Sequence, residues 1–365
     1  MTEETFSTIS HSSVAMTTEQ EDVSQTTRGN NRTSSSSDTT EIVFRCAAVV
    51  IGIVGAVANG LVLYAMVASK QHKKQLLIFN QNIFDLCCCL ILAVTYILKL
   101  CNIHLTGALG YWLCMLLISE SLLWLTVNGS VMNLLSITIE RYLKVVHPAF
   151  SKKYLRKWVI YMAIAFVWIS ATTYNMAVVF STSRVIDGVC YSYTLWESRM
   201  AATIHGIWHF ISFHVIVLIG FVFCYGHILI VIRRQTRVMA AHSRSSTTQT
   251  SSNKAQSNVI KTMILVCALY AITATPDHIW YLLVDVLNLP LSGSVHYATT
   301  FITFLYICTN PFIYAAKFDA VRRELSRLIV CMKTSVEPAQ NSLPMRTRSV
   351  RSAQDAGQID MNATR

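Results

Sequence analysis

Five polar residues interrupt apolar runs at places where a membrane interior would exclude them. They are Asn59, Asp85, Ser130, Asn133 and Asn310. An unsatisfied charge near the bilayer midplane costs on the order of 3 kcal/mol, so an ionised Asp85 needs a counter-charge. Carboxylate, hydroxyl and amide oxygens are hard ligands that suit an alkali cation. We therefore predict a sodium ion bound by Asp85 and Ser130, with Asn310 nearby. The alternative for each single residue is hydrogen-bonding glue between helices.

Three histidines form a second candidate site. His205 and His209 are spaced i, i+4 and share a helix face, so with His278 they could bind zinc. Packing or the lining of a pocket is the preferred interpretation. No combination of a nucleophile and a base appears in the chain, so the sequence does not support an enzyme.

The elements that carry these residues are long apolar runs. The chain has 365 residues, 53% hydrophobic and only 13% charged, with a mean hydropathy of +0.44. This charge content is about half that of ordinary soluble proteins. A bilayer core about 30 Å thick requires roughly 20 apolar residues per helix. Uncharged or nearly uncharged runs of that length cover about 46–68, 76–98, 109–139, 158–180, 203–232, 259–284 and 295–316. They predict an all-α membrane protein, because a β-barrel would show short alternating segments.

The positive charges indicate how the chain crosses the membrane. Of the 30 Lys and Arg residues, 24 lie between the first two runs, within 141–158, within 233–261 and from 317 onward. By the positive-inside rule these regions are cytoplasmic and the N-terminus is extracellular. This distribution requires an odd number of membrane crossings, and seven is odd. The membrane topology also explains the net charge of +11, so no nucleic-acid partner is needed to account for it.

The two ends of the chain are polar. Residues 1–44 hold 19 Ser and Thr, and we predict a disordered extracellular tail. The start has no signal-peptide pattern, so the first run is expected to act as the signal anchor. Asn31 is the glycosylation sequon that this topology places on the extracellular side, where it can be glycosylated. We predict a seven-helix domain over 45–332 and a disordered cytoplasmic tail over 333–365.

The eleven cysteines do not form a disulfide framework. Most lie inside the apolar runs, where Cys acts as a small hydrophobic residue. Cys114 and Cys190 differ, because both fall at the outer, oxidising side.

A set of residues in fixed order gives the chain a resemblance to a known family. The set includes Gly55, Asn59, Asp85, Cys114, Glu140-Arg141-Tyr142, His147-Pro148, Trp168, Cys190, Tyr225, Pro276 and Asn310-Pro311-Phe312-Ile313-Tyr314. The sequence resembles the rhodopsin-like G-protein-coupled receptors over about 41–332. Within that family it most resembles the neuropeptide-receptor branch.

The resemblance implies roles for these residues. It pairs Cys114 with Cys190 in a disulfide and makes the sodium ion a ligand of the inactive state. At the inner end it implies activation of a heterotrimeric G protein through a group of residues: Glu140, Arg141, Tyr142, Tyr225, Asn310, Pro311 and Tyr314. Pro276 and Pro311 each remove a helix hydrogen bond and produce a kink. Arrestin, receptor kinases and membrane lipid are further implied partners, at the plasma membrane.

Four departures from the family pattern are visible. Cys114 lies 27 residues before Arg141, about two more than usual, which predicts a bulge or a longer turn in the upper part of the third run. The fifth run has no Pro, the sixth has Ala274 in place of a Trp, and Glu140 replaces the commoner Asp.

The agonist is predicted from the outer residues. Counting back 18 from Arg141 reaches Leu123, not the Asp that amine receptors of this family use. The expected lining of the outer cavity is instead broad and mixed: Tyr96, Glu120, His209, Asp277, His278, Tyr281 and Phe304. Such a lining suits a peptide, with Glu120 and Asp277 as partners for a basic group. A small amine or lipid ligand is the alternative.

Other classes of membrane protein fit less well. A seven-helix transporter would show internal repeats, and none is seen. A retinal-binding opsin would need a Lys within 295–316, which has none.

Residues 318–331, FDAVRRELSRLIVC, predict a short amphipathic helix on the inner leaflet, with Cys331 suited to palmitoylation.

Overall fold

The computed structural model describes residues 30–241, 247–287, 289 and 292–336, with side chains except at 30–38, 236, 238–241, 247–258, 285 and 329–336. The α-helices of this part are α1 (Asn30–Ala68), α2 (Leu76–Leu100), α3 (Gly107–Leu113), α4 (Ser121–Val146), α5 (Pro148–Tyr154), α6 (Lys157–Thr182), α7 (Arg199–Phe210), α8 (Ile216–Ala241), α9 (Thr247–Tyr281), α10 (Gly293–Lys317) and α11 (Asp319–Val336). The shorter elements are the 3-10 turn η1 (Gln71–Lys73), the π-helical turns η2 (Cys114–Ile118), η3 (Ile211–Val215) and η4 (Leu282–Val286), and the strands β1 (Arg184–Ile186) and β2 (Val189–Tyr191).

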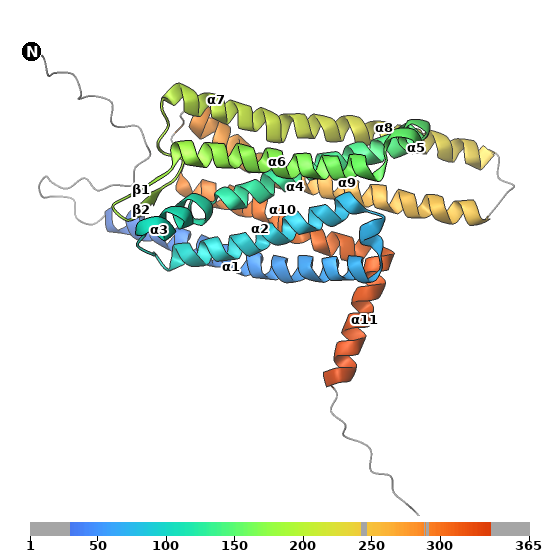
Figure 1. Cartoon of the computed structure of the whole chain (residues 1–365), viewed down its shortest axis with the longest axis horizontal. Coiled ribbons are helices and arrows are strands. Elements are labelled where there is room, and N and C mark those ends of the chain that lie inside the picture. The colour runs from blue at the N-terminus through green and yellow to red at the C-terminus, as the bar shows by residue number, and fades with distance from the viewer. Residues whose placement is uncertain (1–29, 242–246, 288, 290–291, 337–365) are drawn as a thin grey trace, which may run out of the picture. The chain divides into compact units, whose positions relative to one another are not determined.

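The long helices form one bundle with α4 inside it. α4 packs against α2, α6 and α8, while α1 packs against α2 and α10, and α9 packs against α10. Figure 1 shows these helices lying side by side along the long axis, with the β1–β2 hairpin and α3 together at one end. This arrangement places residues distant in sequence, on α2, α4 and α10, at the same depth of the bundle.

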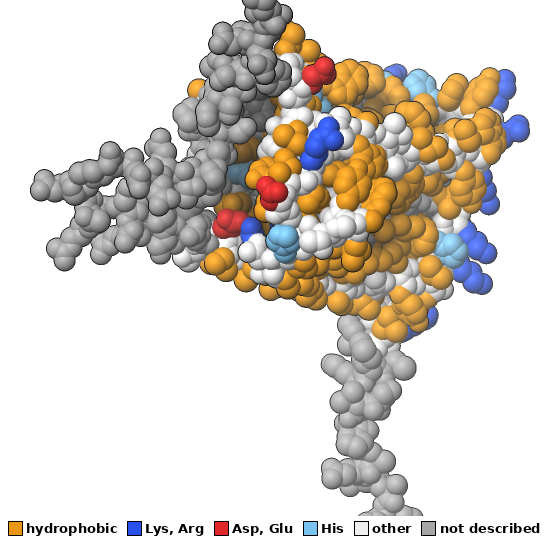
Figure 2. Space-filling model, turned by 60° about the vertical axis from the view of Figure 1, so that its left-hand side comes forward, with side chains coloured by type: hydrophobic (Ala, Val, Ile, Leu, Met, Phe, Trp, Pro, Cys, Tyr) orange, Lys and Arg blue, Asp and Glu red, His pale blue; other side chains and the backbone are white. Residues whose placement is uncertain are grey.

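The outer surface of the bundle is apolar, as a membrane requires. Val57, Phe166 and Val222 are among its exposed large side chains, at 61%, 65% and 76% exposure. Six stretches are each long and apolar enough to span a bilayer, and α10 qualifies together with residues 319–328, beyond a sharp bend. Figure 2 shows hydrophobic side chains along the flanks, a group of Lys and Arg at one end, and the acidic groups together with a few basic ones at the other. The predicted all-α membrane bundle is confirmed.

The third predicted run is broken near its outer end. The π-helical turn η2 separates α3 from α4, and Glu120 between them has a left-handed φ of 62°. Ser119 Oγ and Ser121 Oγ both donate to Met115 O, at 2.7 and 2.5 Å, so the disturbed turn keeps hydrogen-bonding partners. This break accommodates the extra residues before Arg141, and the predicted bulge is confirmed.

The fifth run is also irregular although it lacks Pro. The π-helical turn η3 divides it into α7 and α8. Such a turn displaces backbone carbonyls from their usual helix partners. The carbonyl of Phe213 accepts a hydrogen bond from Tyr270 Oη on α9 at 2.6 Å. The turn therefore gives α9 an attachment point on the fifth span.

The outer loop is a hairpin fastened to the third span. Asp187 and Gly188 have φ values of 50° and 76°, which is the left-handed pair that a tight two-residue hairpin turn requires. The predicted disulfide between Cys114 and Cys190 is confirmed, with Cα atoms 5.4 Å apart. It joins β2 to η2 and so fixes the hairpin beside the outer end of the bundle.

The ends of the described chain differ in part from expectation. α1 begins at Asn30, so helix extends into the residues predicted as tail, where Glu41 pairs with Arg45 one turn later. At the other end, Val321 is buried and Leu325 packs against the core, whereas Arg322 is exposed. This first part of α11 has the predicted amphipathic character. The described residues from 326 to 336 belong to a second unit of the chain.

Candidate functional site

Arg141 lies at the inner end of α4 with a partner on its own helix. Its Nη2 is 3.4 Å from Glu140 Oε2, and the other oxygen of Glu140 pairs with Lys144 at 2.5 Å. The Nε of Arg141 is buried without a hydrogen-bond partner among the described residues. The sequence contains no Asp or Glu between Glu197 and Asp277. The inner ends of α8 and α9 therefore offer no carboxylate that could tie Arg141 to them.

Neutral contacts connect the inner helices. Thr138 Oγ1 donates to Tyr225 Oη at 3.2 Å, and Cys267 Sγ lies 3.9 Å from the same hydroxyl, so α4, α8 and α9 meet there. Tyr142 Oη is 3.3 Å from His227 Nδ1 on α8. These polar contacts between neutral groups are individually weak.

The two proline residues of the predicted set lie inside their helices. Pro276 is within α9 and Pro311 within α10, so each removes one backbone hydrogen bond. Tyr314, one turn after Pro311, is buried, and its hydroxyl has no hydrogen-bond partner in the described part of the chain.

Asp85 is the centre of a buried polar group. Ser130 Oγ donates to Asp85 Oδ1 at 2.9 Å and Asn310 Nδ2 donates to Asp85 Oδ2 at 3.0 Å. All three residues are fully buried. The structure thus brings together the three residues of the predicted sodium site, one each from α2, α4 and α10.

A chain of side-chain amides leads to Asp85. Trp168 Nε1 donates to Asn80 Oδ1 (3.1 Å), and Asn80 Nδ2 donates to Asn133 Oδ1 (2.9 Å). Asn133 Nδ2 then donates to Gln81 Oε1 (2.8 Å), and Gln81 Nε2 donates to Asp85 Oδ1 (3.2 Å). Every donor in this chain points toward the carboxylate. The network therefore favours a negative charge on Asp85.

The oxygen atoms around Asp85 suit a sodium ion. Asn310 Oδ1 and Tyr306 Oη are buried beside this group, and Tyr306 lies near both Ser130 and Asn310. Tyr306 lies close enough to Asp85 to interact with it electrostatically. A carboxylate with nearby hydroxyl and amide oxygens is the donor set that a hard cation prefers. The residues present therefore fit the predicted ion.

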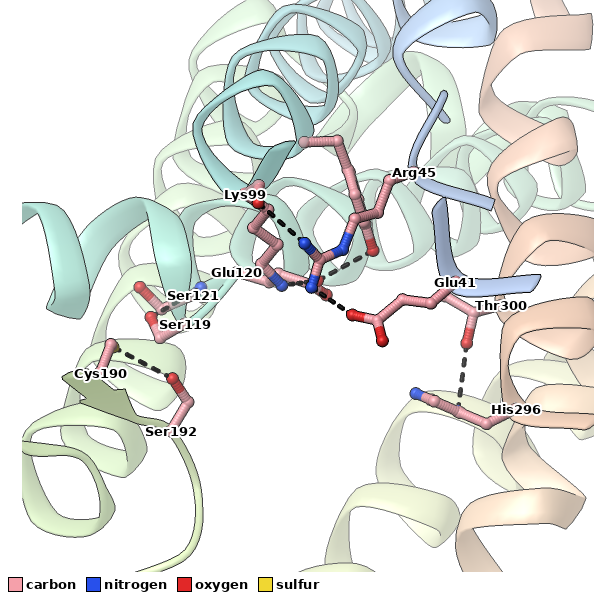
Figure 3. Close-up of polar contacts among 11 residues, drawn as sticks. Glu41, Arg45, Lys99, Ser119, Glu120, Ser121, Cys190, Ser192, His296 and Thr300 are labelled. Carbon is pink, nitrogen blue, oxygen red and sulfur yellow. Dashed lines mark hydrogen bonds and ion pairs between the residues drawn. The ribbon is translucent and has the colours of Figure 1, made fainter. Parts of the chain in front are cut away.

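Glu120 is paired with a cation of the protein. Lys99 Nζ forms an ion pair with Glu120 Oε1, and Tyr96 Oη donates to the same oxygen at 2.9 Å. Arg45, which pairs with Glu41, donates through Nη1 to the backbone carbonyl of Lys99 at 2.8 Å. Figure 3 shows Arg45, Lys99 and Glu120 converging from the first three spans. This arrangement connects the outer end of α1 to the break in the third span.

Asp277 has a different environment. Its Oδ1 accepts hydrogen bonds from Thr300 Oγ1 at 2.9 Å and Thr299 Oγ1 at 3.2 Å. It is 1% exposed, and within the described residues it forms no ion pair with Lys or Arg. Of the two predicted acidic partners for a ligand, Asp277 is therefore the one that lacks a protein cation.

Aromatic rings link the remaining predicted pocket residues. The ring centroid of Phe304 lies 6.3 Å from that of Tyr96, and Trp124 contacts both Phe304 (6.2 Å) and Tyr281 (6.3 Å). We call Tyr96, Glu120, His209, Asp277, His278, Tyr281 and Phe304 the outer cluster. Its members come from α2, the α3–α4 break, α7, α9 and α10.

The histidines stack and do not form a metal site. The His209 and His278 ring centroids are 5.6 Å apart, and His214 lies 4.6 Å from His278. Tyr174 Oη is 2.8 Å from His205 Nε2. No group of three or more His, Cys, Asp or Glu in the described part of the chain is placed to hold a metal ion. Zinc therefore has no support among the described residues, and the stacked rings fit packing or the lining of a pocket.

Two important residues were not assigned from the sequence. Gln81 lies one helical turn before Asp85, and this i, i+4 spacing was the available signal. Lys99 is a charge at the outer end of an apolar run, but its partner Glu120 depends on the irregular turn before α4. Two assigned residues, Asn31 and Cys331, have side chains outside the described set, so glycosylation and palmitoylation stay predictions.

Comparison with known proteins agrees with this geometry. The family model "7 transmembrane receptor (rhodopsin family)" matches residues 58–314, more than half of the chain. The chain is 25% identical to G-protein coupled receptor 15 of Mus musculus over 304 residues, which is 78% of each chain. It is 22% identical to somatostatin receptor type 4 of Rattus norvegicus (80% of this chain, 73% of the relative) and 21% identical to galanin receptor type 1 of Mus musculus (82% and 86%). The chain belongs to the rhodopsin family of seven-transmembrane receptors.

Proposed function

We propose that this receptor binds an extracellular peptide agonist and activates a heterotrimeric G protein at the plasma membrane. The observation that carries the proposal is Asp277, a buried carboxylate held by two threonine hydroxyls at the outer end of the bundle. One of these hydroxyls, Thr300 Oγ1, also lies 3.3 Å from His296 Nδ1, and the other members of the outer cluster supply aromatic and imidazole rings. A basic side chain or a terminal ammonium group of a peptide would supply the missing counter-charge, while other side chains pack against the rings.

The relatives support a peptide agonist. Two of those named above are receptors for somatostatin and galanin, which are both peptides. A lipid agonist has weaker support: lysophosphatidic acid receptor 3 of Mus musculus is 23% identical, over 63% of this chain.

A monoamine agonist is disfavoured by the geometry of α4. Leu123, at the position where amine receptors of the family carry an acid, is fully buried and apolar. The nearest acid, Glu120, is already paired with Lys99.

The inner end supports coupling to a G protein. Arg141 is paired within its own helix, and α9 is connected to α4 by weak neutral contacts near Tyr225. A helix inserted by a G protein has carbonyl groups that Arg141 can bind once α9 moves outward. An agonist that binds the outward position of α9 more tightly shifts the population toward it.

A sodium ion is part of the proposal. Asp85, Ser130 and Asn310 would hold it, and it would neutralise the buried carboxylate and favour the inactive state. The Ser- and Thr-rich segments at 235–258 and after 333 are proposed sites for receptor kinases and arrestin, and both lie largely outside the described side chains.

The test is a dose–response of G-protein activation in cells against pools of peptides, monoamines and lysolipids. We expect a peptide pool to activate wild-type receptor and to fail with Arg141→Ala at equal surface expression. Activation by a monoamine below micromolar concentration, without a response to any peptide pool, would overturn the peptide assignment.

A further inference from the structure

Gln81 is a buried polar residue beside Asp85 that the proposed function does not use. It is fully buried on α2, one turn before Asp85. Its Nε2 donates both to Asp85 Oδ1 (3.2 Å) and to Ser130 Oγ. These are two of the three groups that we assign to the sodium ion. The amide of Gln81 thus bonds to the same oxygens that a cation would need.

The other end of the Gln81 side chain is fixed. Its Oε1 accepts a hydrogen bond from Asn133 Nδ2 at 2.8 Å, and Asn133 is held in turn by Asn80 and by the carbonyl of Leu77 at 3.0 Å. With its oxygen committed, the Gln81 amide can direct only N–H donors toward Asp85. A positive edge of an amide partly replaces the charge of a cation beside a carboxylate.

We propose that Gln81 competes with sodium for Asp85 and Ser130 and so sets the sodium affinity of this receptor. When the amide is bonded to both oxygens, the carboxylate is satisfied by donors of the protein. When sodium binds, the Gln81 amide has to withdraw from at least one of them. The inference rests on the proposed sodium site and adds the residue that tunes it.

The competition has a structural consequence. Gln81 also accepts a hydrogen bond from Asn133. Movement of Gln81 would therefore shift the hydrogen bonds of Asn133 and Asn80, and that of Trp168 on α6. Sodium occupancy would then alter the packing of α2, α4 and α6 together, in addition to its contact with α10 through Asn310.

The experiment measures thermal unfolding of purified, agonist-free receptor against NaCl, with choline chloride keeping the ionic strength constant. Gln81→Met removes the donors and keeps a flexible side chain of similar length. A hydrogen bond to a charged group typically accounts for about a factor of ten, so the half-maximal sodium concentration should fall about tenfold. Gln81→Glu keeps an oxygen for Asn133, removes the amide donors and adds a carboxylate beside Asp85, so it should lower that concentration further than Gln81→Met does.

Asn82→Met is the matched control. Asn82 is the adjacent buried amide on α2, but it donates to the carbonyl of Ile78 at 2.8 Å and not to Asp85. It should leave the sodium midpoint unchanged, and Asp85→Asn should abolish the sodium response.

The outcomes separate the two proposals. A wild-type sodium midpoint that stays the same in Gln81→Met and Gln81→Glu overturns the role of Gln81 and leaves the sodium site standing. The absence of any sodium response in wild type and in both Gln81 variants overturns the site itself, and the inference with it. G-protein activation by peptide is measured separately and would be unaffected by that result.

Discussion

Lys99 and Glu120 form an ion pair across the outer ends of the second and third spans, with both side chains largely buried. The pair fixes the left-handed turn that separates η2 from α4. Tyr96 adds a hydrogen bond to the same carboxylate. Glu120 therefore stabilises the outer end of the bundle and has its counter-charge before any ligand arrives.

This relationship predicts a pair of stability effects. Glu120→Gln leaves Lys99 without its partner and should lower the free energy of unfolding by about 2 kcal/mol, as expected for a partly buried pair. The double variant Lys99→Met/Glu120→Gln removes both charges and should recover most of that loss. Thermal unfolding of purified receptor measures both. Equal losses in the single and double variants would show that the charges are independent.

Asp277 should behave in the opposite way. Asp277→Asn still accepts the hydroxyl hydrogen bonds of Thr299 and Thr300 but carries no unneutralised charge. We expect the agonist-free variant to gain on the order of 1 kcal/mol in unfolding free energy. Its affinity for an agonist peptide with a basic group should fall about thirtyfold or more, since a buried charge partner is lost.

Competition binding measures that affinity, and the matched comparison is the same peptide with its basic residue replaced by a neutral one. Asp277→Asn should bind the two peptides equally. If Asp277→Asn keeps the full preference for the basic peptide while Glu120→Gln loses it, the roles of the two acids are reversed.

The disulfide should contribute strongly to stability. Cys114 and Cys190 are 76 positions apart, and closing a loop of this length contributes up to about 4 kcal/mol. Cys190→Ala should therefore lower the unfolding temperature clearly, while Cys101→Ala, at an exposed free cysteine, should not. Non-reducing peptide mapping checks the bond directly. Recovery of Cys114 as a free thiol from folded receptor is the contrary result.

A close approach of α1 to α2 depends on Gly52. A Cβ atom there would lie 2.9 Å from the backbone nitrogen of Ala93 and the carbonyl oxygen of Cys89. Gly52→Ala should force the helices apart and reduce stability by about 2 kcal/mol. Gly60→Ala on the same helix meets nothing within 4 Å and should be neutral or slightly stabilising. Similar unfolding temperatures for the two variants would contradict this packing.

The parts of the structure that depend on long-range sequence patterns were predictable. Seven long apolar runs predict the helical bundle, and the resemblance to the rhodopsin-like receptors supplies the Cys114–Cys190 pairing that the structure confirms. The extra spacing before Arg141 also predicted the irregular turn at η2. These sequence patterns are reliable because each follows from a general requirement of membranes or of backbone geometry.

The contacts that depend on how the helix faces pack against one another were not predictable. The sequence pattern around a Gln in an apolar run does not distinguish a hydrogen bond to a neighbouring helix from one to Asp85. No role was therefore predicted for Gln81. Lys99 and Glu120 meet because of the left-handed turn at residue 120, which no sequence pattern specifies. The helical start at Asn30 was missed because a Ser- and Thr-rich segment has the composition of a flexible tail.

The central claim is that this chain transmits agonist binding at the outer cluster to a G protein through Arg141. The most direct measurement is the rate of GDP-for-GTP exchange on purified heterotrimeric G protein with receptor in lipid nanodiscs, with and without an activating peptide pool. The account predicts that the peptide accelerates exchange with wild-type receptor and not with Arg141→Ala, although both bind the peptide. Undiminished acceleration by Arg141→Ala at equal receptor concentration would contradict it.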